Sequence, residues 1–287
     1  MADLQVGPIE TAIEGVVDGI WSVTEDLDGN LYVICKTGDI FSVVDRQCQQ
    51  LYNTGGQPTS LAFDPQGSAY ICDQAHQAIL CQTDVENRVE VTPIVRDYES
   101  KPLLGPNTVV LSQHNNFLYF TDSGPMGEST IANPRGSLYA ADLDLLVLKP
   151  IILNCLAHPS GLTFSNDEKV IFLAETLKNR VLRIAHKPSG VPHVSVFYQF
   201  SGRMGPTALA MSENNLLYVA HFDYAEYSKN GLIAVIDMEG HLVNSFTLPN
   251  APEITGLYVS RHKPNLLYIT ESSTGSCYRL VIPSESS

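Results

Sequence analysis

Two recurring sets of side chains in this sequence could carry chemistry. Members of the first set come directly before short apolar runs, and members of the second come at the end of apolar runs that contain an aromatic residue. The first set is Trp21, Thr59, Asn107, Ser160, Thr207 and Thr255, and the second is Cys35, Asp73, Asp122, Glu175, His221 and Glu271. Carboxylates and histidine can transfer protons, and amide, hydroxyl and carboxylate oxygens can hold a cation or a polar ligand.

A structural role competes with the catalytic one at these positions. Aspartate at the end of a strand often accepts hydrogen bonds from the turn that follows, and we favour this role for Asp73 and Asp122. Glutamate and histidine are poorer turn formers, so both roles stay open for Glu175, His221 and Glu271. If they are catalytic, Glu175 or Glu271 could act as the acid or base beside His221.

The residues in question are positioned by an internal repeat. Six segments share one pattern: a short apolar strand, a polar turn, and a second strand with an aromatic residue. The segments begin near residues 22, 60, 108, 161, 208 and 256, at spacings of 38 to 53 residues. This spacing is typical of four-stranded propeller blades, which bury their faces only by packing against neighbouring blades.

We therefore predict an all-β fold in which residues 1–287 form one six-bladed β-propeller of four-stranded antiparallel blades. The ring must close, and residues 4–13 could supply the outer strand of the last blade. Both sets of polar residues should then lie at one mouth of the central channel, because the first two strands of each blade are antiparallel.

Composition excludes several functions. The formal net charge of −14 gives no electrostatic support for binding nucleic acid. The N-terminal segment lacks the features of a signal peptide, and no run reaches the length of a membrane span. We expect a cytoplasmic or other intracellular soluble protein. The six cysteines show no paired spacing, so we expect small buried residues rather than disulfides or a zinc site.

Several segments resemble the superfamily of senescence-marker-protein/gluconolactonase and strictosidine-synthase-like six-bladed propellers. The resemblance covers roughly residues 14 to 280, most specifically 105 to 240. It is carried by "GPNTVV", "LYFTDSG", "HPSGLTFSNDEKVIFLAETLKNRVLRI" and "NNLLYVAHF" followed by "NGLIAVIDMEG". It implies the fold first, and function only through the residues of a site.

The resemblance also implies a ligand set for one divalent cation: a glutamate before the first blade, two asparagines and an aspartate. Glu14 could be the glutamate, with Asp18 an equal alternative, and Asn107 matches the first asparagine. Ser160 and Thr207 stand at the other two positions. Two neutral hydroxyls should weaken binding of Ca²⁺, Mg²⁺, Mn²⁺ or Zn²⁺, so we expect no resident cofactor, with a weakened cation site as the alternative.

Two functions follow from this reading. The one we favour from sequence is a non-catalytic propeller that binds a protein partner or a small molecule at the channel face. It rests on the altered ligands, the acidic surface and the long loop over residues 123–136. The alternative is a hydrolase of a lactone or carboxylic ester, supported by the resemblance and by the retained Asn107, Asp122 and His221.

Overall fold

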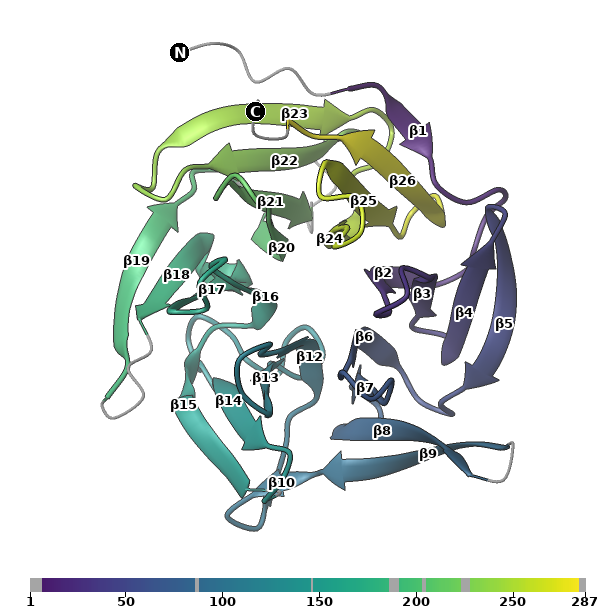
Figure 1. The fold of residues 1–287 in the computed structure, drawn as a ribbon. Coiled ribbons are helices and arrows are strands. Elements are labelled where there is room, and N and C mark those ends of the chain that lie inside the picture. The colour runs from purple at the N-terminus through teal and green to yellow at the C-terminus, as the bar shows by residue number, and fades with distance from the viewer. Residues whose placement is uncertain are drawn as a thin grey trace.

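A computed structural model describes residues 7–85, 88–145, 147–185, 191–202, 205–222 and 228–283. Six four-stranded antiparallel sheets radiate from a central axis, as predicted (Figure 1). In the first five blades the strands follow chain order from the innermost outward. The order arises because strands that are neighbours in sequence pair in space, most of them across short connections and β13 and β14 across the longer loop 123–135.

The first three blades begin at Ile20 and end at Leu156, and a short hairpin leads into the third. Blade 1 comprises β2 (Ile20–Glu25), β3 (Leu31–Cys35), β4 (Asp39–Val44) and β5 (Gln47–Asn53). Blade 2 comprises β6 (Pro58–Phe63), β7 (Ala69–Asp73), β8 (Ala78–Val85) and β9 (Arg88–Val95). The hairpin is β10 (Asp97–Tyr98) with β11 (Lys101–Pro102), and blade 3 comprises β12 (Pro106–Leu111), β13 (Phe117–Asp122), β14 (Gly136–Asp142) and β15 (Val147–Leu156).

The last three blades complete the ring. Blade 4 comprises β16 (Pro159–Phe164), β17 (Val170–Glu175), β18 (Arg180–Ala185) and β19 (His193–Gln199), with a 3-10 turn η1 (Thr176–Lys178). Blade 5 comprises β20 (Gly205–Met211), β21 (Leu217–Phe222), β22 (Gly231–Ile236) and β23 (Leu242–Leu248). Blade 6 comprises β24 (Ile254–Val259), β25 (Leu266–Glu271), β26 (Ser276–Val281) and β1 (Ile9–Thr11).

The N-terminal strand closes the ring. β1 pairs antiparallel with β26, placing Ile9 opposite Leu280 and Glu10 opposite Arg279 (Figure 1). The Glu10 carboxylate accepts a hydrogen bond from the Arg279 guanidinium at 2.7 Å. Residues 4–13 were expected to supply the outer strand of the last blade, and Ile9–Thr11 among them form it. Closure covers the outer edge of β26 with a strand, which removes one exposed edge.

The core lies between blades and not within them. Successive clusters pack one sheet face against the next, and the aromatic residue of each second strand contributes to them. The rings of Tyr119 and Phe164, for example, meet edge to face at 5.2 Å across blades 3 and 4. Cys35, Cys72, Cys81 and Cys277 are buried in this core as expected, whereas the thiol-bearing Cys155 is exposed.

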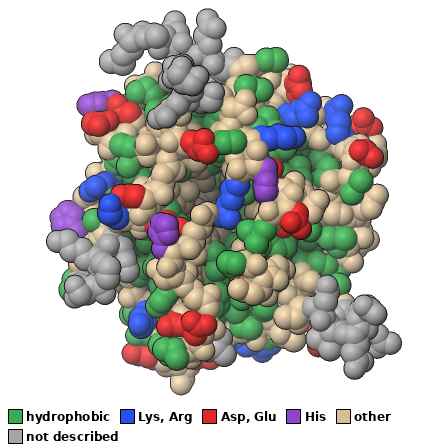
Figure 2. All heavy atoms as spheres, in the orientation of Figure 1, with side chains coloured by type: hydrophobic (Ala, Val, Ile, Leu, Met, Phe, Trp, Pro, Cys, Tyr) green, Lys and Arg blue, Asp and Glu red, His purple; other side chains and the backbone are tan. Residues whose placement is uncertain are grey.

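Over the described residues, no helix is long and apolar enough to cross a membrane. On the face shown in Figure 2, Lys and Arg side chains are interspersed with Asp and Glu side chains, and hydrophobic side chains lie among them near the centre.

Candidate functional site

Every innermost strand has a register shift at the same place. It separates the first residue paired with the second strand from the rest of the ladder, as between Ile20 and Ser22 and between Pro58 and Ser60. The shift recurs in the other four blades. A bulge turns its side chain out of the ordinary alternation of a strand. The residues at these shifts are the first set predicted from sequence, here called the bulge ring: Trp21, Thr59, Asn107, Ser160, Thr207 and Thr255.

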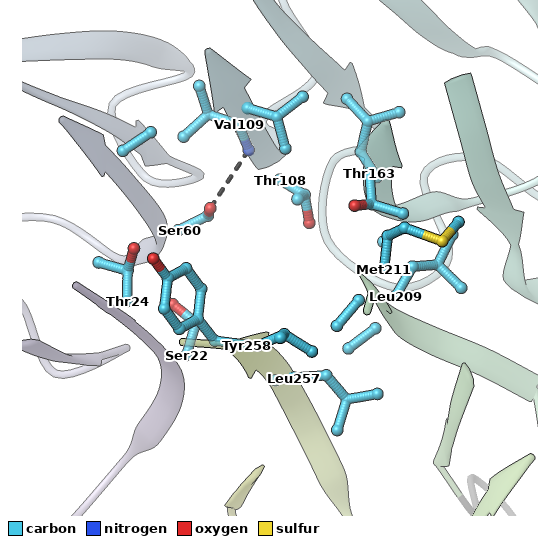
Figure 3. Close-up of a pocket in the computed structure, with 18 of the residues that line it drawn as sticks. Ser22, Thr24, Ser60, Thr108, Val109, Thr163, Leu209, Met211, Leu257 and Tyr258 are labelled. Carbon is cyan, nitrogen blue, oxygen red and sulfur yellow. Dashed lines mark hydrogen bonds between the residues drawn. The ribbon is translucent and has the colours of Figure 1, made fainter. Parts of the chain in front are cut away.

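All six members of the bulge ring line one central channel of about 700 Å³. Further along the innermost strands the wall carries small, hydroxyl and apolar side chains, and Figure 3 shows Ser22, Thr108 and Leu209 among those around this space. Gln113, Glu168 and Arg261 line the channel beyond the strands' other ends. The channel is large enough for a small organic ligand.

Hydroxyls in and beside the bulge ring join consecutive blades. Thr59 Oγ1 donates to the Asn107 carbonyl at 2.6 Å, and Thr207 Oγ1 donates to the Ile254 carbonyl at 3.0 Å. We call these contacts blade staples. The other three are Thr121 to the Ser160 carbonyl, Thr176 to the Pro206 carbonyl and Thr270 to the Trp21 carbonyl. A hydroxyl has a single proton to donate, so these protons are not free for a ligand.

Ser160 also takes part in this network. Its Oγ lies 2.7 Å from the staple hydroxyl of Thr176 and within 3.4 Å of the same Pro206 carbonyl. Asn107 donates its side-chain amide to Ser123 Oγ at 3.1 Å and is 7% exposed. Thr255 contacts Thr270 Oγ1 at 3.2 Å. The positions that the resemblance assigns to metal ligands thus contribute to contacts between and within blades.

The second set lies at the same strand ends as the bulge ring, because each member pairs with the residue just before a bulge, but its side chains do not line the channel. None of Asp73, Asp122, Glu175, His221 and Glu271 lines the channel. Each of the four carboxylates instead accepts a backbone N–H from a residue one or two positions before an innermost strand. These donors are Gln57, Gly105, Ala157 and Glu253, at 2.8 to 2.9 Å. The carboxylates satisfy buried backbone donors where the chain turns inward, and we call them clasp carboxylates.

Glu175 is the clasp carboxylate that is paired with two cations. It is fully buried, and its oxygens lie 2.8 Å from Lys178 Nζ and 2.6 Å from Arg180 Nη2. Glu271 accepts N–H bonds from Ser273 and Thr274 as well as from Glu253. For both glutamates, these contacts are those of the structural role that the sequence left open beside catalysis. Neither carboxylate lines the channel, and donors already occupy its oxygens. Each therefore has little capacity to transfer protons in the channel.

Asp122 has an unusual protonation balance for a carboxylate. Burial raises its pKa to about 6, even though hydrogen bonds from the Leu104 and Gly105 N–H groups and the charge of Arg135 act to lower it. His221 is 2% exposed, and its ring meets Phe200 edge to face at 4.3 Å. Neither residue reaches the channel lining, so the structure does not bring them together with the bulge ring as one site.

The structure does not place Glu14 beside Asn107. Glu14 is exposed at the outside of blade 1, where its carboxylate accepts a hydrogen bond from Gln47 at 2.6 Å and lies 4.0 Å from Arg46. These partners belong to the outermost hairpin, because β5 begins at Gln47. The alternative, Asp18, is exposed in the turn before β2 and is likewise absent from the channel lining.

The groups at the mouth do not fit a hard divalent cation. The bulge ring offers one amide and four hydroxyls but no carboxylate, and no cluster of three acidic, histidine or cysteine side chains suits a metal among the described residues. Ca²⁺ requires several oxygen ligands with carboxylate charge to compensate for its dehydration.

Two residues at this mouth were missed from sequence, Lys36 and His158. The Lys36 ammonium lies 3.3 Å from the ring centroid of Trp21, and burial lowers its pKa to about 8. His158 lines the channel, is 4% exposed, and takes a left-handed backbone conformation with φ of 52°. Burial, and secondarily the charge of Lys36, lowers the pKa of His158 to about 4. Their blades, 1 and 4, lie on opposite sides of the ring (Figure 1).

Their positions held a signal that could have revealed them. Lys36 directly follows Cys35 of the second set, and His158 stands two residues before Ser160 of the first. A search restricted to the repeated positions passes over both, because each is particular to its own blade.

Comparison with known proteins finds relatives that carry the name lactonase. It is 28% identical over 204 residues to "Lactonase drp35" of Staphylococcus aureus strain MRSA252, which covers 68% of this chain and 58% of that protein. The corresponding protein of Staphylococcus epidermidis is 26% identical over 234 residues, covering 77% and 67%. The chain thus spans between about half and two thirds of the length of these relatives.

Solved structures share the fold at low sequence identity. A gluconolactonase from Xanthomonas campestris superposes with a TM-score of 0.78 at 18% identity, covering 98% of this chain and 92% of that one. A calcium-binding regucalcin from Agrobacterium tumefaciens gives 0.78 at 14%, covering 98% and 96%. The sequence model of the family described as "SMP-30/Gluconolactonase/LRE-like region" matches residues 31–273. The chain therefore belongs to the SMP-30/gluconolactonase/LRE-like family.

Proposed function

We propose that the protein is a hydrolase that opens a small lactone or carboxylic ester at the bulge-ring mouth of its channel. The observation that carries this proposal is a channel with a polar mouth in a chain of the SMP-30/gluconolactonase/LRE-like family. Its relatives carry the name lactonase, which favours the hydrolase over the interaction platform that we preferred from sequence.

The channel offers what ester hydrolysis needs from a binding site. The bulge ring places Asn107 beside the hydroxyl side chains, and the walls below are partly apolar, so a ring-shaped ligand could bind with its ester group at the mouth. The reaction adds water to the acyl carbon, breaks the bond to the ring oxygen and releases a hydroxy acid. A group that stabilises the developing negative oxygen should contribute most to the rate.

The test is hydrolysis of a panel of five- and six-membered lactones and acyclic esters, measured through the acid that is released. We expect Asn107→Leu to lower kcat/KM at least about 10-fold, since it removes the polar amide at the mouth. Asn116→Leu is the control, because Asn116 lies on an exposed loop of the same blade and bonds to Asp144. Absence of hydrolysis across the panel, or equal loss in both variants at equal stability, would overturn the proposal.

A further inference from the structure

Lys36 is a partly buried cation without an anionic partner among the described residues. No ion pair of the described part of the chain includes it. Lys178 and Arg180, in contrast, are both paired with Glu175. Removing an ammonium from water costs free energy, and the face of Trp21 offsets only part of that cost.

The tryptophan fixes where this cation can be. Trp21 occupies the bulge of blade 1 and lines the channel, so an ammonium 3.3 Å from its ring centroid is held at the mouth. The backbone carbonyl of Trp21 accepts the staple from Thr270, which anchors this bulge to blade 6. Lys36 therefore contacts a ring whose backbone is anchored, unlike a lysine that extends freely from the surface.

A second polar group at the same mouth lacks a partner. The Nδ1 atom of His158 is buried and makes no hydrogen bond within the described residues. Buried polar atoms are usually satisfied, so an unpaired one that lines a channel indicates that a ligand or water completes it. Its surroundings include the positive charge of Lys36, which favours a ligand with negatively charged oxygen.

We propose that Lys36, held on Trp21 at the mouth that His158 also lines, binds the acyl oxygens of the substrate and the carboxylate of the product, in place of a divalent cation. This inference rests on the proposed hydrolysis and names the group that stabilises the negative oxygen formed in it. Water adds to the acyl carbon, the carbonyl oxygen gains negative charge beside the ammonium, the carbon–oxygen ring bond breaks, and the leaving oxygen takes a proton. The product is a hydroxy acid that ionises to a carboxylate, which the same ammonium binds.

The chain contains a matched control lysine. Lys149 also lies over an aromatic ring, with its Nζ 5.5 Å from the centroid of Phe117, but it belongs to the outer strand β15, and Phe117, unlike Trp21, does not line the channel. Lys36→Met and Lys149→Met therefore remove the same charge and the same type of ring contact at two places. Lys36→Arg keeps the charge and tests whether the cation suffices.

The experiment measures binding of 4-hydroxybutyrate by calorimetry in the presence of EDTA, with 4-hydroxybutyramide as the neutral counterpart. We expect binding to wild type and Lys149→Met, at least about 10-fold weaker binding to Lys36→Met, partial retention in Lys36→Arg, and about 10-fold weaker binding of the amide. Equal affinity of wild type and Lys36→Met, no binding to wild type, or binding only after Ca²⁺ is added would each overturn the inference.

The outcome separates this inference from the proposed function. Lys36-dependent binding of the carboxylate supports the anion site even if none of the lactones is hydrolysed, in which case the hydrolase proposal alone fails. Hydrolysis that persists unchanged in Lys36→Met would leave the hydrolase intact and overturn the role of Lys36.

Discussion

Glu175 and Arg180 form a two-point ion pair at the base of blade 4, with Nε and Nη2 of the arginine 2.7 and 2.6 Å from the same carboxylate oxygen. The other oxygen accepts the Ala157 N–H and contacts Lys178. The Ala157 hydrogen bond holds the end of β17 against the segment that leads into β16, and the ion pair joins it to the start of β18. A residue that sequence offers as a catalytic candidate thus acts, by its contacts, as part of the scaffold.

Replacing Glu175 should therefore damage stability more than chemistry. Glu175→Gln leaves two cations without their anion, and breaking one partner of a buried pair costs about 3–5 kcal/mol. We expect a melting temperature lower by several degrees, measured by calorimetry. The control is Asp167→Asn, which removes the exposed pair with Lys169 and should change the melting temperature little. A stable Glu175→Gln protein without activity would contradict the scaffold role.

The blade staples should stabilise the ring at its axis. Thr59→Val keeps the shape of a side chain that is 2% exposed but removes the donor to the Asn107 carbonyl. A buried carbonyl that loses its donor costs about 1–3 kcal/mol. Urea unfolding should show this loss with an unchanged slope. Thr37→Val, at an exposed site where the hydroxyl donates to Asp39, serves as the control, and equal small effects for both would argue against the staples.

Asp122 should make folding stability fall as pH rises from about 4 to about 6. Its pKa rises from the ordinary 3.8 to about 6 in the folded protein, so the folded state binds the proton more tightly. This contribution is present below pH 4 and is lost as pH passes through 6, on the order of 3 kcal/mol. Asn cannot titrate, so the stability of wild type relative to Asp122→Asn should fall across this range. A constant difference would contradict the raised pKa.

Lys36 should give the site an upper pH limit. Burial lowers its pKa to about 8, so the ammonium loses its proton above that pH and with it the charge that binds carboxylate. We expect the association constant of 4-hydroxybutyrate to fall about 10-fold per pH unit above pH 8. With an ordinary lysine pKa the decline would begin only above about pH 10. The neighbouring His158 is already neutral there, since its pKa is about 4. Lys36→Arg should remove the decline, and an unchanged decline would assign it to another group.

The repeat allowed the architecture to be predicted, because each copy places apolar residues where two blades meet. Six blades follow from six copies, and the bulge ring follows from the polar residue that precedes each copy. The bulge-ring side chains turn toward the channel because each innermost strand has a bulge there. The residue pattern does not reveal the bulge, which occurs in every blade at the polar residue before the repeated segment.

The second set could not be interpreted in the same way. A residue at the end of a strand can turn toward the channel or toward the chain segment that enters the blade, and only the buried N–H groups of Gln57, Gly105, Ala157 and Glu253 decide between them. These donors lie 16 to 18 residues from their carboxylates. Lys36 and His158 come to the mouth from blades 1 and 4 on opposite sides of the ring, and this relationship requires the closed propeller.

The most direct measurement is the initial rate of lactone hydrolysis by protein dialysed against EDTA, for wild type, Lys36→Met and Lys149→Met, before and after addition of Ca²⁺. The predicted result is hydrolysis by wild type and Lys149→Met without Ca²⁺, and a rate at least about 100-fold lower for Lys36→Met, as expected when a group that stabilises the oxyanion is lost. Hydrolysis that appears only with Ca²⁺ and is equal in all three proteins would contradict the central role of Lys36.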